Sequence, residues 1–192
     1  MKVRTILVLG ALIAVGAALV LPSLSHAQAA PKEDATAAAT PKYFGVAQGC
    51  KGCHMGEAKG KIYEAWALTP HAKAFENLGA ENQKNDACLG CHTTGHGKAM
   101  ATGKSATDLQ GVQCEACHGP GSDYRSLSVM KNKDEAIKKG LIMPTEKTCL
   151  GCHGGPFPQG HKEVPKFDFA TSVKKIEHHM KAAPAAPPTE KK

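Results

Sequence analysis

The apolar and polar positions divide the chain into an apolar beginning, a middle with helical periodicity and two low-complexity stretches. An apolar run of 16 residues from Ile6 to Leu21 follows Lys2 and Arg4, and the small-residue site Ser25-His26-Ala27 comes after it. This layout is typical of a secretory signal, so we expect residues 1–27 to be removed on export. The run is shorter than the roughly 20 apolar residues of a permanent membrane anchor.

Four stretches have the composition and spacing of helices. We expect helices over residues 57–68, which Pro70 ends, over 72–78, over 132–139 and over 168–182. Asn132 is the expected N-cap of the third helix, and Gly140 is its expected stop. Because no sheet is evident, the predicted fold class is mainly α with extensive loop.

Residues 28–42 and 184–192 are rich in Ala, Pro, Thr and Lys and cannot bury a core. We interpret them as a low-complexity N-terminal lead and a disordered tail. Residues 43–183 have the length of one domain. Only 9 of the 192 residues are Phe, Tyr or Trp, so this domain needs apolar surface from another source.

One pattern, C-x-x-C-H, occurs four times and uses all eight cysteines. It is typical of covalent attachment of c-type haem, in which two thiols bind the porphyrin and the next residue ligates the iron. The predicted attachment residues are Cys50, Cys53, Cys88, Cys91, Cys114, Cys117, Cys149 and Cys152, and the predicted proximal iron ligands are His54, His92, His118 and His153. The expected molecule is a compact multihaem cytochrome c organised around four covalently bound haems.

Two other chemistries use C-x-x-C pairs. A zinc knuckle takes four thiolates, and a thioredoxin-like pair is redox-active. Neither requires His directly after the second Cys, and His is only 10 of 192 residues, so four such placements by chance are remote.

Four irons need four further ligands. The distal candidates outside the signal are His71, His96, His161, His178 and His179. His178 and His179 cannot serve the same iron, because neighbouring residues of a helix point about 100° apart. Methionine ligation, which would raise the reduction potential, stays open at Met100, Met130, Met143 and Met180.

The formal charge of +7 does not indicate a nucleic-acid partner. Without Lys2 and Arg4 the 24 basic side chains become 22 against 17 acidic ones, a balance of +5. Four ferric haems with two propionates each bring about four negative charges, so the total falls near +1. The lysines are also scattered, whereas nucleic-acid binding needs clustered basic charge.

The segments Tyr63-Glu-Ala-Trp66-Ala-Leu-Thr-Pro-His71-Ala-Lys-Ala and Gly111-Val-Gln-Cys114-Glu-Ala-Cys117-His118-Gly-Pro-Gly121 resemble the tetrahaem cytochrome c family that accepts electrons from hydroxylamine oxidoreductase. The resemblance covers roughly residues 49–180. It implies that His71 ligates the fourth haem, that His178 or His179 ligates the third, and that the haems stack in the order first, third, fourth, second.

The chain departs from that family at two positions. Residues 126–130 lack the family's ligand to the first haem, and His96 stands where the family has an aromatic residue beside an open second haem. In this the chain resembles the secreted tetrahaem cytochromes of metal-reducing bacteria, of the OmcE type, which polymerise into conducting filaments. In the implied order the first and second haems lie at opposite ends, and His96 stands on a glycine-flanked loop only four residues after His92, too close to reach its own iron from the far side. We therefore expect His96 to close the first haem of the next subunit, which leaves His161 for the second haem.

The expected function is electron transport without catalysis. The main hypothesis is an exported subunit of an extracellular conducting filament for extracellular electron transfer, a homopolymer joined by a haem ligand in trans. Its partners would be redox proteins or extracellular electron acceptors. The alternatives are a soluble periplasmic electron shuttle and a haem enzyme that acts on a small nitrogen oxide at an open iron.

Overall fold

The computed structural model describes residues 40–179, without the side chains of Ala47 and Gln48. The expected signal peptide, the lead up to residue 39 and the expected tail lie outside the described residues. Within residues 40–179, no helix has the length and apolar character needed to cross a membrane.

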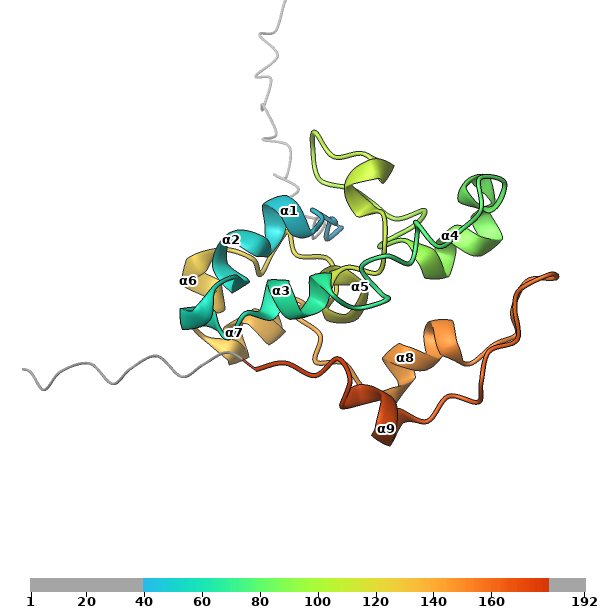
Figure 1. Cartoon of the computed structure of the whole chain (residues 1–192). Coiled ribbons are helices and arrows are strands. Elements are labelled where there is room, and N and C mark those ends of the chain that lie inside the picture. The colour runs from blue at the N-terminus through green and yellow to red at the C-terminus, as the bar shows by residue number, and fades with distance from the viewer. Residues whose placement is uncertain (1–39, 180–192) are drawn as a thin grey trace, which may run out of the picture. The chain divides into compact units, whose positions relative to one another are not determined.

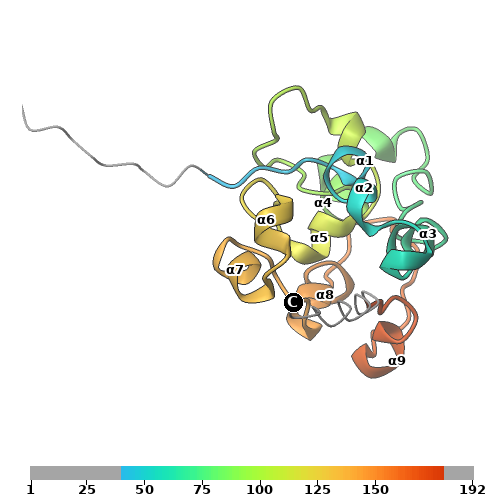
Figure 2. The same ribbon diagram turned by 90° about the vertical axis from the view of Figure 1, so that its left-hand side faces the viewer.

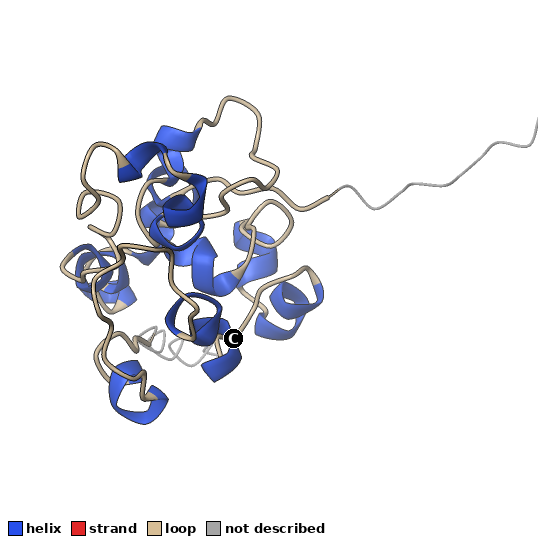
Figure 3. Ribbon diagram, turned by 90° about the vertical axis from the view of Figure 1, so that its right-hand side faces the viewer, coloured by secondary structure: helices blue, strands red, loops and turns tan. Residues whose placement is uncertain are grey.

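Short helices joined by loops make up the described chain (Figure 1; Figure 3), which confirms the predicted fold class. The elements are α1 (Val46–Gly49), α2 (Lys51–His54), η1 (Glu57–Lys59), α3 (Ile62–Ala67), η2 (Asn82–Lys84), α4 (Asp86–His92), η3 (Ala106–Leu109), α5 (Cys114–His118), α6 (Leu127–Met130), α7 (Lys133–Lys138), α8 (Glu146–His153) and α9 (Phe169–Val173). Extended pairing within residues 40–179 is limited to two isolated bridges, Tyr43 with Met100 and Thr93 with Gln110.

Each C-x-x-C-H motif contributes to a short helix that ends at its histidine, namely α2, α4, α5 and α8, and Cys50 directly precedes α2. Residues three and four apart lie on one face of a helix, so each motif presents both thiols and the imidazole together. The Asn85 side chain caps α4 by accepting from the Ala87 N–H at 3.0 Å. Thr145 and Thr148 form a reciprocal cap at α8. Sequence analysis did not predict these four helices.

The helix predicted over residues 132–139 is confirmed as α7. The Asn132 side chain accepts from the N–H groups of Asp134 and Glu135 at 3.0 and 3.1 Å. The helix ends before Gly140, whose φ of 102° suits glycine. Helix α7 lies beside α6 (Figure 2).

We expect Asn132→Ala to lower the free energy of unfolding by about 1 kcal/mol, because two N–H groups of α7 lose their acceptor. Denaturant titration measures the change. Ser126→Ala is the matched control, since Ser126 precedes α6 without capping it, and its hydroxyl lies 3.2 Å from the Ser128 hydroxyl. Equal losses in both variants would contradict a capping role for Asn132.

The predicted helix over residues 72–78 is wrong. The chain there forms successive turns, because tertiary contacts occupy carbonyls that a helix would use. The His71 carbonyl accepts from the Val112 N–H at 2.9 Å, and the Ala74 carbonyl lies 2.7 Å from the Nδ1 of His92. The backbone of this segment therefore positions His71 and the imidazole of His92 instead of forming a helix.

Two further helices are shorter than predicted. The helix expected over residues 57–68 is split into η1 and α3, because Gly60 and Lys61 adopt positive φ angles of 80° and 54°. Of the helix expected over 168–182, α9 forms with the Asp168 side chain as its cap, and residues 174–176 continue only as turns. Residues 180–182 lie outside the described residues.

Few apolar side chains of the described polypeptide are buried. They are Val46, Ile62, Ala101, Leu109, Tyr124 and Ala136. Three polar side chains, Thr94, Gln113 and Glu115, are buried with them around the third motif. Protein contacts alone therefore make a small core, as the scarcity of aromatic residues led us to expect.

Candidate haem-binding sites

The cysteines of the four motifs form a row whose order differs from that in the sequence. The thiols of Cys50 and Cys114 act on each other, raising the pKa of Cys50 and lowering that of Cys114, which places the first motif beside the third. Burial raises the pKa of Cys117, and the Cys149 thiol adds to that shift, which places the fourth motif next. Burial and then the Cys91 thiol raise the pKa of Cys152 to about 12, so the second motif follows the fourth. Helices α4 and α8 are in contact, in agreement with this order.

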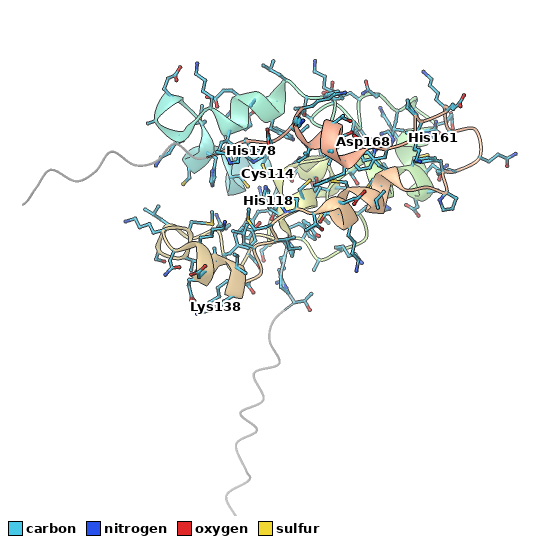
Figure 4. All side chains as sticks on the ribbon, turned by 90° about the horizontal axis from the view of Figure 1, so that it is seen from below. Cys114, His118, Lys138, His161, Asp168 and His178 are labelled. Carbon is cyan, nitrogen blue, oxygen red and sulfur yellow. The ribbon has the colours of Figure 1, made fainter. Side chains whose placement is uncertain are left out.

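Three of the four motif histidines face a second histidine. The ring centroids are 5.9 Å apart for His71 and His153, 6.3 Å for His92 and His161, and 5.9 Å for His118 and His178. Figure 4 shows His118 and His178 together beside Cys114, with His161 well away from them. The three pairs come from different parts of the chain, so tertiary structure creates them.

This spacing fits a metal ion between the two rings. Two imidazoles on one metal have centroids about 6 Å apart, since a metal–nitrogen bond is about 2 Å and each ring centre lies about 1 Å behind its nitrogen. The donors are those of haem iron with two axial histidines. Ligation at His71, His161 and His178 stays a prediction, as does that of the proximal histidines.

Backbone carbonyls orient two of the motif imidazoles. The Nδ1 of His118 lies 2.9 Å from the Ile142 carbonyl, much as that of His92 lies beside the Ala74 carbonyl. When Nδ1 donates to a carbonyl, Nε2 is left unprotonated and free to bind a metal. Burial is the largest cause that lowers the pKa of both His71 and His118, which favours the neutral imidazole that metals bind.

His71 is held in place by the segment before the third motif. The Trp66 indole N–H donates to the Val112 carbonyl at 2.9 Å, and the Val112 N–H donates to the His71 carbonyl. Trp66, Val112 and His71 line one cavity together with His118 and His178. The two sequence segments that carry the family resemblance thus contact each other.

Gly111 allows this close approach. Its φ is +81°, and a Cβ there would lie 2.6 Å from the Ala72 carbonyl oxygen. Thr94, which is 1% exposed, donates to the Gly111 carbonyl at 2.8 Å. The backbone at Gly111 is therefore fixed from both sides.

The remaining histidines are placed differently. The Nε2 of His96 lies 3.1 Å from an Asp86 carboxylate oxygen of the same chain. No ring pair of the kind described above includes His54, His96 or His179 in residues 40–179. Burial lowers the pKa of His54, and His178 and His118 add to the shift, so His54 lies near the third motif's pair.

Two phenylalanines that contact the paired histidines were not predicted from the sequence. Phe167 stacks on His153, and Phe157 stacks on His161, each at 5.0 Å between ring centroids. Both lie in the segment after the fourth motif, and the nearness of Phe157 to His161 in the sequence was the available signal. Each phenyl ring restricts the rotation of one imidazole in a facing pair, His153 opposite His71 and His161 opposite His92.

Similarity to known proteins supports four covalently bound c-type haems as the cofactors of this chain. Residues 49–119 match the family model for cytochrome c554 and c-prime, so over this segment the resemblance to a cytochrome family is confirmed.

Cytochrome c-554 of Nitrosomonas europaea is 34% identical over 135 residues, which are 54% of this chain and 54% of that protein. The match thus spans about half the length of the curated relative. The solved structure of the reduced state of cytochrome c554 from Nitrosomonas europaea has 26% sequence identity and a TM-score of 0.45, and it covers 70% of this chain and 78% of that one.

Proposed function

We propose that this protein is an exported tetrahaem electron carrier without catalytic activity. The observation that carries the proposal is the continuous row of motifs, in the order first, third, fourth, second, with a facing histidine at three of them. Haem supplies a one-electron couple whose potential depends on its axial ligands and its burial. The chain's own residues hold the four sites next to one another and orient their imidazoles.

Within this proposal a periplasmic shuttle between redox proteins is favoured over an extracellular filament. The match to cytochrome c-554 supports the shuttle. The expected role of His96 in trans lacks support, because its Nε2 lies beside Asp86 of its own chain. We propose hydroxylamine oxidoreductase as the electron donor, because the resemblance to its acceptor family implies that partner.

The purified full-length holoprotein tests the electron-carrier role. We expect four haems per chain by pyridine haemochrome assay, a monomer by light scattering, and reduction of all four haems in a stopped-flow experiment with a small reductant. Fewer than four reducible haems per chain would contradict the proposal.

His96→Ala separates the shuttle from the filament. We expect unchanged haem content, spin state and mass in solution, because the substitution removes only a pairing with Asp86, an exposed contact worth less than about 1 kcal/mol. Electron microscopy of the secreted fraction and light scattering make the measurement. Filaments that form in the wild type and are absent in the variant would refute the shuttle hypothesis and support the filament hypothesis.

The remaining alternative is an enzyme that acts on a small nitrogen oxide. Its test is the electron paramagnetic resonance spectrum of the oxidised protein with and without nitrite or hydroxylamine. We expect no turnover of either compound. Catalytic consumption of one of them would contradict a purely electron-carrying role.

A further inference from the structure

A buried carboxylate lies at the contact between the first and third motifs. Glu115, in α5, is 2% exposed. It accepts from the N–H groups of Phe44 at 3.1 and 3.0 Å, of Gly45 at 2.7 Å and of Gly121 at 2.6 Å. All of these partners are donors, so the side chain is in the acceptor-only, negatively charged form.

This charge is close to two haem-attachment residues. Glu115 follows Cys114 in the sequence and lies within electrostatic range of both Cys114 and Cys50. Among residues 40–179, Glu115 is the charged residue in the buried class, while the Lys104 side chain, 4% exposed, lies 3.6 Å from an Asp108 carboxylate oxygen. Arg125, an exposed residue, brings a positive charge to this contact, because its guanidinium lies over the Phe44 ring at 3.9 Å and its charge acts on the Cys50 thiol.

We propose that Glu115 lowers the reduction potentials of the haems at the first and third motifs and so directs electrons toward the fourth and second. A ferric haem carries one more positive charge than a ferrous one, so a fixed negative charge nearby stabilises the oxidised state. The effect is strong because the carboxylate is shielded from water. This inference rests on the proposed electron-carrier function and adds a direction to it.

Glu115→Gln keeps the shape of the side chain and removes its charge. At a fixed applied potential, the ratio of reduced to oxidised haem at the first and third motifs should rise about tenfold, as expected for one charge at a partly shielded distance. For a one-electron couple, tenfold corresponds to about 59 mV. Spectroelectrochemical titration of the full holoprotein measures this as an upward shift of two of the four couples.

Gln113→Leu is the matched control. Gln113 lies on the other side of Cys114, is 6% exposed, and accepts from the Val46 N–H at 2.6 Å. Both side chains therefore tie the segment 44–46 to the third motif, but only Glu115 carries a charge. We expect Gln113→Leu to reduce stability without an upward shift of the two couples. An equal upward shift in both variants would show that the hydrogen bonds to segment 44–46, and not the charge of Glu115, set the potentials, and it would overturn the proposal.

Arg125→Gln tests the same field without disturbing a buried group, should Glu115→Gln not accumulate as holoprotein. Removing this positive charge leaves Glu115 uncompensated, so the same two couples should shift downward. Unchanged couples in Arg125→Gln or in Glu115→Gln would refute the inference. If four haems are still reduced in those variants, the electron-carrier function stands while its proposed direction fails.

Discussion

Replacing His71 by alanine is expected to convert one of the four haems from low spin to high spin while all four stay covalently attached. His71 faces His153 at 5.9 Å between ring centroids and comes from a segment far from the fourth motif in the sequence. The substitution removes one axial imidazole but leaves Cys149, Cys152 and His153 in place. The visible and electron paramagnetic resonance spectra report the spin state, and haem staining of a denaturing gel reports attachment.

The three ring pairs supply their own controls for this prediction. His161→Ala should produce a high-spin haem of similar amount, and the double variant with His71→Ala should produce twice as much, because the two residues face different motifs. Exogenous imidazole should restore low spin in each variant. If His71→Ala leaves the spectrum entirely low spin, the assignment of His71 as a ligand is wrong.

Gly111→Ala should lower the free energy of unfolding by about 3 kcal/mol. Two costs add at this position. The φ of +81° is unfavourable for alanine, and its Cβ would meet the Ala72 carbonyl oxygen, a backbone atom that cannot turn away. The displaced carbonyl belongs to the residue after His71, so we also expect a partial high-spin signal.

Gly97→Ala separates the two costs. Gly97 has a φ of +68°, and no atom lies within 4 Å of the place that a Cβ would occupy, so alanine there meets strain without a clash. We expect a loss of only about 1 kcal/mol at this position. Guanidinium titration gives both values from the shift in midpoint at constant slope. Equal losses at Gly111 and Gly97 would mean that the contact between Gly111 and Ala72 yields without cost.

The covalent haem sites could be predicted from the sequence because their chemistry is local. Five consecutive residues contain both thiols and one imidazole, and a single helical turn brings them together. The facing histidines are not local in this sense. No spacing rule pairs His92 with the distant His161, or distinguishes His178 from His179. The structure makes both choices, since it places His161 opposite His92 and His178 opposite His118.

The helices were predicted least well where backbone groups serve the sites. Residues 72–78 have helical composition, yet the His71 and Ala74 carbonyls bind partners from distant segments. Helix propensity predicts a helix where the backbone hydrogen bonds can be made within one segment. It fails where groups from other segments take those hydrogen bonds. Helix α7 has a local cap and a local stop, and there the sequence was sufficient.

The difference between chain order and spatial order has a consequence for maturation. The second motif is translated and exported before the third and fourth, yet its neighbour in the row is the fourth, through Cys91 and Cys152. A nascent chain that has received its first three haems therefore still lacks the motif that lies between the third and the second in the row. The row is complete only when the last motif, which places Cys152 beside Cys91, has been delivered.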